Sequence, residues 1–248
     1  MDENKFIVKF AQTKEEKEQL YKVRYDEMIR YFHELNNVES SEEMDYTPYD
    51  DKAKSIIVID QKTNMIVGGY RIMLSSDLSE NEKFLCEEEF DITTLKESNQ
   101  LIVELSRAFV KKEYRNSNVL LLIWKYMFHY VLSIGARYIV GDVSFTSRNP
   151  EDNKYALSDI YYHYGIDDSL NIKSTQPNCS IKLLEKEELD RNKAKEQQPA
   201  LVKAYILFGA KFSKEYFIDN DFCSLDIFVL VDSLNYNKKF IDRILDRK

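Results

Sequence analysis

A carboxylate and an arginine stand three residues apart in Leu101–Val110, LIVELSRAFV, which is otherwise mostly apolar. A carboxylate inside an apolar strand is costly unless it is paired or functional. Glu104 is therefore a candidate general base, able to take a proton from an amine before the amine attacks an acyl donor. The alternative is structural: Glu104 forms a buried ion pair with Arg107 or Arg71 that only fixes the strand.

The three-residue spacing of Glu104 and Arg107 constrains the backbone conformation between them. Side chains three residues apart on a regular strand point to opposite faces, because the side-chain period is two. Both can line one cleft only if a bulge intervenes. We therefore predict a backbone irregularity between Val103 and Arg107.

Basic residues follow this strand at Lys111, Lys112 and Arg115, although the chain carries a net charge of -8. Such a cluster favours an anionic ligand. The stretch Leu101–Val119 contains no glycine, so it lacks the glycine-rich cradle that binds phosphates through backbone N–H groups. The alternative is a set of solvent-facing cations at the end of a strand.

Composition limits the class of protein. A chain of 248 residues with 44% hydrophobic residues can bury a core as one sizeable domain. Its acidic balance argues against nucleic-acid binding through a positive field. Cys86, Cys179 and Cys223 are far apart and match no ligand spacing, so we expect neither a disulfide framework nor a metal site.

The ends and the apolar runs predict a cytoplasmic protein with at most peripheral membrane contact. The N-terminal stretch MDENKFIVKF is acidic and has no apolar signal-peptide core. The longest apolar run, VLLLIWKYMFHYVLSIGA, is interrupted by Lys125 and His129 and is slightly too short to span a bilayer. It therefore predicts a buried helix.

The elements that must position these residues follow from periodicity and from turn and cap signals. We expect a helix capped by Thr13, with Glu16 completing a capping box, and a long helix capped by Asn116 or Ser117 and ended by Gly135. Further helices are expected at 151–164, from Pro199, and at the C-terminus. Strands are expected at 6–11, 55–60, 66–74, 101–110, 137–145 and 224–232.

The remaining segments predict loops. The chain from Glu34 to Asp50 is acidic and aperiodic, which indicates an extended loop. The polar stretch of about 165–198 contains the charge run EKEELDRNKAKE and predicts a flap or helical insertion. No repeat or low-complexity linker interrupts the sequence, so we expect a single domain over residues 1–248.

The element order predicts an α/β fold. A mixed, mostly antiparallel sheet comes first and a strand–helix–strand crossover follows, with helices on both faces. This order resembles the GCN5-related N-acyltransferase (GNAT-like) fold. In that fold the fourth and fifth strands, here near Leu101–Val110 and Tyr138–Phe145, splay apart into a cleft.

Sequence blocks sharpen the resemblance. VELSRAFVKKEYRN with LLLIWKYMFHYV, then VGDVSF, then PALVKAYILFGAKF with SLDIFVLVD, are similar to blocks of the bacterial ornithine-lipid-type N-acyltransferases. That family is related to the acyl-homoserine lactone synthases. Upstream, both families keep an arginine, two acidic residues and a second arginine. The matching positions here are Arg24, Asp45, Asp50 and Arg71.

The resemblance implies an enzyme of lipid biosynthesis that moves a long-chain fatty acyl group to the amine of an amino acid or small amino compound. It places Glu104 and Arg107 at the catalytic centre and Ser144 beside the pantetheine arm. It places four residues on the acceptor side: Arg24, Asp45, Asp50 and Arg71. Without it, Asp45 and Asp50 read as ordinary loop residues and Ser144 as an ordinary strand serine.

The donor that the resemblance implies is acyl-phosphopantetheine, as a substrate and with no resident cofactor. Acetyl-CoA enzymes of this fold bind pyrophosphate at a glycine-containing turn, whereas the matching turn here, RNSNVL, has Asn118 and Leu120 at the small positions. We therefore expect acyl carrier protein as donor and partner in preference to coenzyme A. Lys111, Lys112 and Arg115 would dock its acidic helix.

Two other functions remain open. One is an acyl-homoserine lactone synthase, although the C-terminal block LVKAYILFGAKF favours the lipid-type enzymes. The other is a non-catalytic protein of the same fold that binds an acyl chain or a carrier protein. Retention of Glu104 and Arg107 favours an active enzyme. No serine or cysteine has a nucleophile-elbow context, so we expect direct transfer without an acyl-enzyme.

Overall fold

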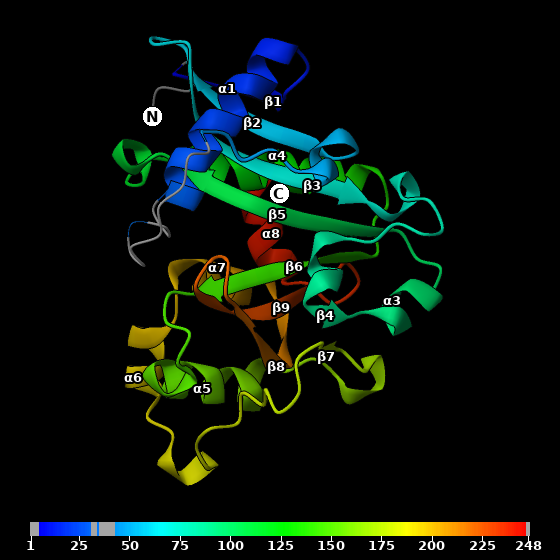
Figure 1. Ribbon diagram of the computed structural model, residues 1–248, viewed down its shortest axis with the longest axis vertical. Coiled ribbons are helices and arrows are strands. Elements are labelled where there is room, and N and C mark those ends of the chain that lie inside the picture. The colour runs from blue at the N-terminus through cyan, green and yellow to red at the C-terminus, as the bar shows by residue number, and fades with distance from the viewer. Residues whose placement is uncertain (1–4, 31–33, 35–42, 247–248) are drawn as a thin grey trace. The chain divides into compact units, whose positions relative to one another are not determined.

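The computed structural model describes residues 5–30, 34 and 43–246 (Figure 1). The chain divides into two compact units. The first contains residues up to Ser79, Leu105–Gly135 and the chain from Asp242 onward; the second contains Glu80–Glu104 and Ala136–Ile241. The boundary after Glu104 falls inside strand β5 (Ile102–Val110), so this strand contributes to both units.

The sheet has seven strands in the order β1-β2-β3-β5-β6-β9-β8. The β1–β2, β2–β3, β6–β9 and β8–β9 pairs are antiparallel, and the β5–β6 pair is parallel. The mixed, mostly antiparallel sheet predicted from element order is confirmed. The strand bounds are Phe6–Phe10 (β1), Lys54–Asp60 (β2), Met65–Leu74 (β3), Tyr138–Phe145 (β6), Lys211–Asp219 (β8) and Ser224–Asp232 (β9).

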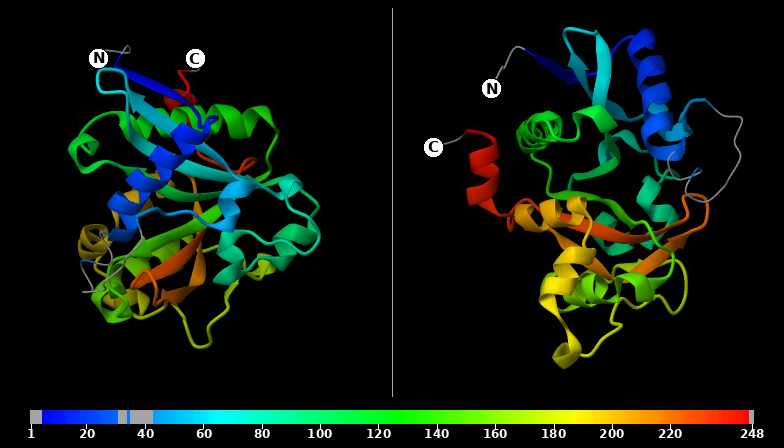
Figure 2. Two further views of the ribbon diagram at one scale, coloured as in Figure 1. Left: turned by 45° about the horizontal axis from the view of Figure 1, so that its top comes forward. Right: turned by 90° about the vertical axis from the view of Figure 1, so that its left-hand side faces the viewer.

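In the first unit, two helices cover opposite faces of the β1–β3 strands, as the right-hand view of Figure 2 shows. They are α1 (Lys14–Arg24) and α4 (Val119–Ser133). On the α4 face, a side chain at Gly68 would meet Val119 Cγ1 at 2.7 Å. Glycine at this position therefore lets α4 approach the sheet.

The helix signals in the sequence act largely as predicted. Thr13 and Glu16 form the predicted capping box at the start of α1. A five-residue π-helix, Tyr25–Ile29, continues α1. The cap of α4 is Asn118, which lies beyond both predicted cap residues. Gly135 follows α4 with φ +68°, the left-handed conformation that glycine adopts at little cost.

Hydrophobic spacing explains why α4 packs on the sheet. Its buried side chains include Val119, Ile123, Met127 and Val131, each four residues from the next, so they share one face. On the other face of the sheet, Leu20 and Val23 of α1 pack in a cluster with Ile57, Ile66 and Phe109. The apolar helix predicted from VLLLIWKYMFHYV is therefore a core helix.

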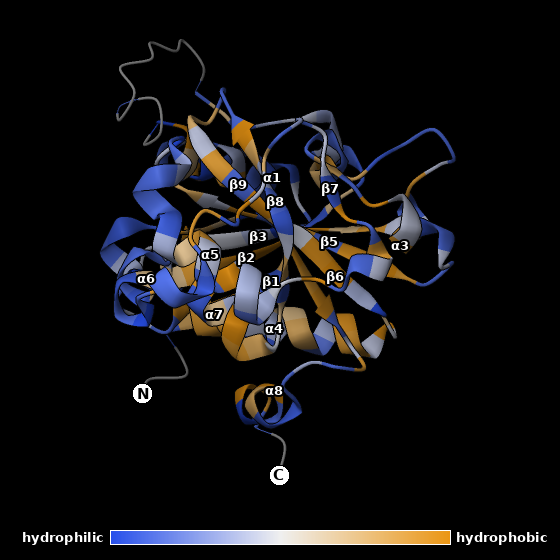
Figure 3. Cartoon of the chain, turned by 90° about the horizontal axis from the view of Figure 1, so that it is seen from below, coloured by the Kyte–Doolittle hydropathy of each residue, from blue (hydrophilic) through white to orange (hydrophobic). Residues whose placement is uncertain are grey.

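The second unit adds helices around the β6–β9–β8 strands. Helix α5 (Lys154–Tyr164) packs against both β8 and α6 (Arg191–Gln197). Figure 3 shows α6 mainly in the hydrophilic colour and β9 mainly in the hydrophobic colour. The remaining helices and short strands are α3 (Thr93–Glu97), α7 (Ala200–Phe208), α8 (Lys238–Ile244), β4 (Phe90–Asp91) and β7 (Lys173–Ser174). Single 3-10 turns occur at Pro48–Asp51, Ser75–Asp77, Leu85–Glu88, Lys112–Tyr114, Pro150–Asn153, Asp168–Leu170 and Lys186–Glu188.

Two segments differ from the sequence-based expectation. Strand β8, KFSKEYFID, was not predicted, because its apolar residues do not alternate regularly and its ladder with β9 shifts register between Phe212 and Tyr216. The predicted loop from Glu34 lies partly outside the described residues; within them, Pro48–Asp51 forms a 3-10 turn. No helix in the described ranges combines the length and apolar character that a membrane span requires.

Strand β5 has an irregular backbone at Arg107, at the end of the stretch where an irregularity was predicted. Arg107 has φ +57°, a left-handed conformation that is uncommon for a residue with a side chain. The parallel ladder with β6 pairs Ile102–Glu104 with Tyr138–Val140 and stops there, although β6 continues to Phe145. The predicted irregularity between Val103 and Arg107 is present.

Candidate active site

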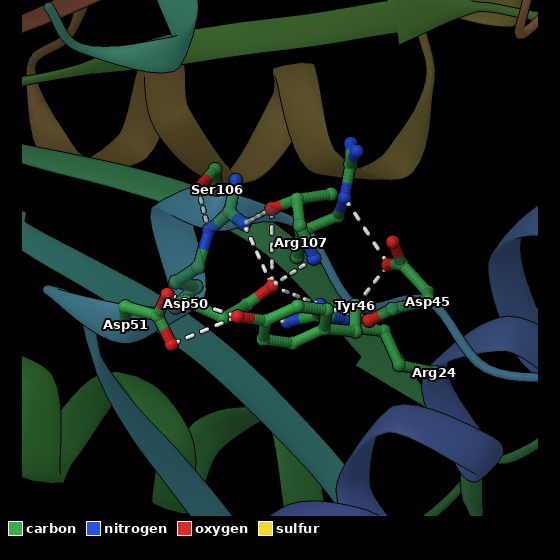
Figure 4. Close-up of polar contacts among 9 residues, drawn as sticks. Arg24, Asp45, Tyr46, Asp50, Asp51, Ser106 and Arg107 are labelled. Atoms are coloured by element: carbon green, nitrogen blue, oxygen red, sulfur yellow. Dashed lines mark hydrogen bonds and ion pairs between the residues drawn. The ribbon is translucent and has the colours of Figure 1, made fainter.

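In the first unit, Arg24 and Asp50 form a paired fork at the centre of a buried charge cluster (Figure 4). Nη1 of Arg24 donates to Oδ1 of Asp50 at 2.9 Å, and Nη2 donates to Oδ2 at 2.8 Å. Both side chains are 1% exposed. This bidentate geometry is the strongest form of the arginine–carboxylate pair.

Arg71 joins the cluster from β3. Its Nη1 lies 3.4 Å from Oδ2 of Asp50 and donates to the Thr47 hydroxyl at 3.0 Å, while Nε donates to the Ser106 hydroxyl at 3.0 Å. Thr47 caps the Pro48–Asp51 turn, and its backbone N–H donates to Asp50 at 2.9 Å. A capping box therefore helps to fix Asp50 in addition to its ion pairs.

The arginines decide the protonation state of the cluster. Burial is the largest influence on the pKa of Asp50 and would raise it, but the hydrogen bond and charge of Arg24 and the charge of Arg71 leave that pKa lowered. Burial would likewise lower the pKa of Arg24, and its bonds to Asp50 and Asp45 leave it raised. Asp50 and Arg24 therefore stay ionised at neutral pH.

Arg107 is held at the edge of this cluster by Asp45. One oxygen of Asp45, Oδ2, lies 2.7 Å from Nε of Arg24 and 3.2 Å from Nε of Arg107. The Arg107 side chain is 15% exposed, against 1% for Arg24 and 0% for Arg71. Among these three arginines, Arg107 has the most exposed side chain.

Four of the predicted acceptor residues and one predicted catalytic residue thus meet in one cluster of the first unit: Arg24, Asp45, Asp50, Arg71 and Arg107. Whether they touch an acceptor stays a prediction. The burial of Arg24, Arg71 and Asp50 favours a positioning role for those three, since they bond to one another. Arg107 is the member best placed for contact with a ligand.

In the second unit, Glu104 is 1% exposed. The backbone N–H of Cys86 donates to Oε1 of Glu104 at 2.7 Å. Burial is the main reason that the pKa of the Cys86 thiol lies well above its ordinary value, and the charge of Glu104 adds to the effect. The role of Glu104 as a base stays a prediction, and this hydrogen bond fixes the position of one of its oxygens.

The three basic residues after β5 differ in their exposure and in their hydrogen bonds. Arg115 donates to Oε2 of Glu27 at 3.1 Å and to the Val110 carbonyl at 3.2 Å, so its guanidinium group is fastened to the protein. Lys112 is exposed and Lys111 is partly buried. The docking role of this patch stays a prediction, with Lys112 the most accessible of its lysines.

Ser144 lies on β6 opposite Asp226 of β9. Its hydroxyl lowers the pKa of Asp226, while burial and the charge of Asp142 raise it by more. The predicted contact of Ser144 with the pantetheine arm stays a prediction.

Several partners in these networks were not identified from the sequence. Ser106 and Thr47 bond to Arg71, and the Cys86 backbone bonds to Glu104. The sequence T-P-Y-D contains the Thr47–Asp50 capping box, so that element could have been found. The Cys86 contact joins residues 18 positions apart, and no local pattern signals it.

Comparison with protein families and known proteins shows what this chain resembles. Residues 23–125 match the acetyltransferase (GNAT) domain. The L-ornithine N(alpha)-acyltransferase of Rhodobacter capsulatus is 27% identical over 180 residues, 73% of this chain and 69% of that protein. The enzyme of the same name from Brucella abortus is 26% identical over 212 residues, 82% of this chain and 75% of that protein.

Solved structures support the fold. An N-acyl amino acid synthase from uncultured soil microbes superposes with a TM-score of 0.52 and 8% identity, covering 93% of each chain. A CoA-dependent acyl-homoserine lactone synthase with S-adenosylmethionine and isopentyl-CoA also has a TM-score of 0.52, with 11% identity, and covers 92% of this chain and 80% of its own. The predicted resemblance is confirmed: this chain has a GNAT acyltransferase fold and is an N-acyltransferase.

Proposed function

We propose that this enzyme transfers a long-chain fatty acyl group from the phosphopantetheine thioester of acyl carrier protein to the α-amine of an amino acid. The product is an N-acyl amino acid or a lipid precursor derived from one. Ornithine is the first acceptor to test, because two curated relatives are L-ornithine acyltransferases. The observation that carries the proposal is Glu104: a buried carboxylate held by the Cys86 N–H, three residues before the left-handed Arg107.

Glu104 has the properties of a general base for this reaction. An amino acid carries an ammonium group at neutral pH, and this group cannot attack until it loses a proton. Glu104 takes that proton, the free amine attacks the thioester carbonyl, and the C–N bond forms as the C–S bond breaks. The phosphopantetheine thiolate leaves and takes up a proton. A positioned base contributes about 10²- to 10⁴-fold in rate.

Arg107 supplies the complementary group for the acceptor carboxylate. A guanidinium group matches a carboxylate in a bidentate way. Asp45 orients Arg107 through Nε, while the buried Arg24–Asp50 pair fixes the cluster behind it. This arrangement supports binding of an acceptor that carries a carboxylate.

The donor proposal rests on the turn before α4. Glycine is absent from the Arg115–Leu120 turn, and the side chain of Arg115 bonds to Glu27. A carrier protein delivers one phosphodiester together with an acidic docking surface, so it depends less on a backbone cradle than coenzyme A does. Exposed Lys112 offers a cation for that surface.

The test is a donor and acceptor matrix with purified protein. Palmitoyl carrier protein and palmitoyl-CoA are each incubated with L-ornithine, other amino acids or S-adenosylmethionine, and the products are identified by mass spectrometry. The proposal expects an N-acyl amino acid, formed faster from the carrier protein. Lys112→Glu should raise the KM for the carrier protein several-fold, less so at high salt. Acyl-homoserine lactone formation, or equal use of both donors, contradicts it.

A further inference from the structure

A second cluster of titratable groups lies in the second unit and takes no part in the reaction described above. One carboxylate oxygen from each of Glu89, Asp142 and Asp226 lies within 4.8 Å of the other two. We call these three residues the acid triad. Glu89 follows the Leu85–Glu88 turn, Asp142 is on β6 and Asp226 is on β9.

The sheet register places the two aspartates on one face. Asp226 pairs with Ser144, which stands two residues from Asp142 on β6. Paired residues of an antiparallel ladder share a face, and so do residues two apart on one strand. Asp142 and Asp226 are therefore diagonal neighbours, with Glu89 completing the triad from outside the sheet.

The triad is built for a positive charge. Asp226 is 2% exposed, and its Oδ2 accepts from the Ser224 hydroxyl at 3.2 Å. A hydrogen bond from the Ser144 hydroxyl to this carboxylate also lowers its pKa, by less than burial and Asp142 raise it. Its Oδ1 is buried, and no donor among the residues that the structure describes hydrogen-bonds to it. Burial first, and then the neighbouring carboxylates, raise the pKa values of both Asp226 and Glu89. A cation would remove this repulsion.

The triad also lies close to Glu104. Glu104 pairs with Val140 on β6, and Asp142 follows Val140 by two residues on the same face. This spacing along a strand is about 7 Å. Cys86 links the two places: its N–H bonds to Glu104, and the charges of Glu104 and Asp142 both raise the pKa of its thiol after the larger effect of burial.

We infer that the acid triad is a cation-binding subsite that takes the side-chain ammonium group of a diamino acid acceptor. This assignment rests on the proposed function, because it places the α-amine of the same molecule at Glu104. Glu104 and Asp142 lie on the same face of adjacent strands, two residues apart in register. The triad would then select basic amino acids over neutral ones of the same length.

Carboxylates also bind hard divalent cations, so the experiment has to separate the two sources of charge. L-ornithine is compared with L-norvaline, which has the same carbon skeleton without the terminal amine. Binding is measured by calorimetry and turnover by acylation, in both cases after treatment with EDTA. MgCl₂, CaCl₂ and MnCl₂ are titrated separately.

The variants are chosen as neighbours on one segment. Glu89→Gln removes a triad carboxylate, whereas Glu88→Gln makes the same change at an exposed residue outside the triad. Asp142→Asn is a second test of the triad. We expect Glu89→Gln and Asp142→Asn to weaken ornithine binding and raise its KM by about 10- to 100-fold, the usual range for a hydrogen-bonded charge. Norvaline values and the Glu88→Gln variant should change less than about twofold.

The outcomes separate the two proposals. Ornithine binding that depends on Glu89 supports the triad assignment even if no acylation is found. The absence of acylation would contradict only the proposed function. Acylation with equal preference for ornithine and norvaline overturns the triad assignment alone. A divalent ion that binds the wild-type protein and not Glu89→Gln, with no binding of ornithine, also overturns it.

Discussion

Two buried groups of carboxylates in this molecule show opposite responses to burial. In the first unit, Asp50 is 1% exposed and its pKa is lowered, because Arg24 and Arg71 more than offset the cost of burying its charge. In the second unit, Asp226 is 2% exposed and its pKa is raised to about 8, first by burial and then by the charges of its acidic neighbours, with no arginine among the described residues to offset either effect. The partner, and not the depth of burial, decides which form of the carboxyl group is stable.

The two groups of carboxylates differ in whether the protein itself compensates their charge. The Arg24–Asp50 pair is complete within the protein and needs no ligand to compensate it. The acid triad collects like charges, which oppose folding unless a proton or a cation compensates them. The first arrangement suits a rigid support for Arg107, and the second suits a binding site.

The largest expected effect comes from breaking the compensated group. Asp50→Asn should lower the free energy of unfolding by about 3–5 kcal/mol, because it leaves Arg24 and Arg71 buried without their shared carboxylate. Urea denaturation measures this change. The matched control is Asp51→Asn, an exposed neighbour bonded to the Tyr46 hydroxyl, which should cost less than about 1 kcal/mol. Equal losses in both variants would show that the buried pair has no special weight.

The same comparison predicts how Arg24 and Arg107 differ. Lysine keeps the charge but loses the planar fork. Arg24→Lys should destabilise the protein by about 2–3 kcal/mol through loss of the bidentate bond to buried Asp50. Arg107→Lys should leave stability within about 1 kcal/mol and raise the KM for the amino acid about tenfold. Arg107→Lys with unchanged acceptor kinetics would remove Arg107 from acceptor binding.

The smallest expected effect is a pH dependence of stability, which has opposite signs for Asp226 and Asp50. A carboxyl group with a raised folded-state pKa contributes stability below its unfolded pKa, near 4, and this contribution is lost as pH rises through the folded value. For Asp226 this loss of stability extends from about pH 4 to about pH 8. Burial is the main cause of the raised pKa of Asp226, followed by the charges of Asp142 and, at the end of β8, Asp219. Burial and the same two charges, together with the charge of Asp226, raise the pKa of Glu89. For Asp50 the pH dependence of stability has the opposite sign. Because its pKa is lowered in the folded protein, its contribution to stability is lost only as pH falls below about 4.

Urea denaturation between pH 5 and pH 8 tests this dependence. Stability of the ligand-free wild-type protein should decline by up to about 1.4 kcal/mol per pH unit per coupled proton. Asp226→Asn, which mimics the protonated form, should flatten the decline. A slope that is identical in Asp226→Asn and wild-type protein would show that Asp226 does not titrate in this pH range.

Much of the fold was accessible from the sequence because local signals and hydrophobic periods agreed. The Thr13–Glu16 capping box, the end of α4 before Gly135 and a backbone irregularity at Arg107 all appear in the structure. Strand β8 was missed, because an irregular ladder disrupts the period of two on which strand prediction depends.

The site was predictable as a set of residues, but not as an arrangement. Four charged positions were identified by resemblance, whereas their bonding to one another depends on contacts between segments more than 20 residues apart. The acid triad joins three segments that no spacing rule connects. Its only local signal is a carboxylate within an apolar strand, at Asp142 and Asp226, the same signal that identified Glu104.

The role of Glu104 is tested most directly by the rate of amide formation by Glu104→Gln under single-turnover conditions, with palmitoyl carrier protein and saturating L-ornithine. Glutamine preserves the acceptor oxygen for the Cys86 N–H and removes the base. We expect a rate about 10²- to 10⁴-fold lower, with a melting temperature close to that of the wild-type protein. A variant that unfolds but retains its turnover per folded molecule would show that Glu104 is structural, and would contradict the mechanism.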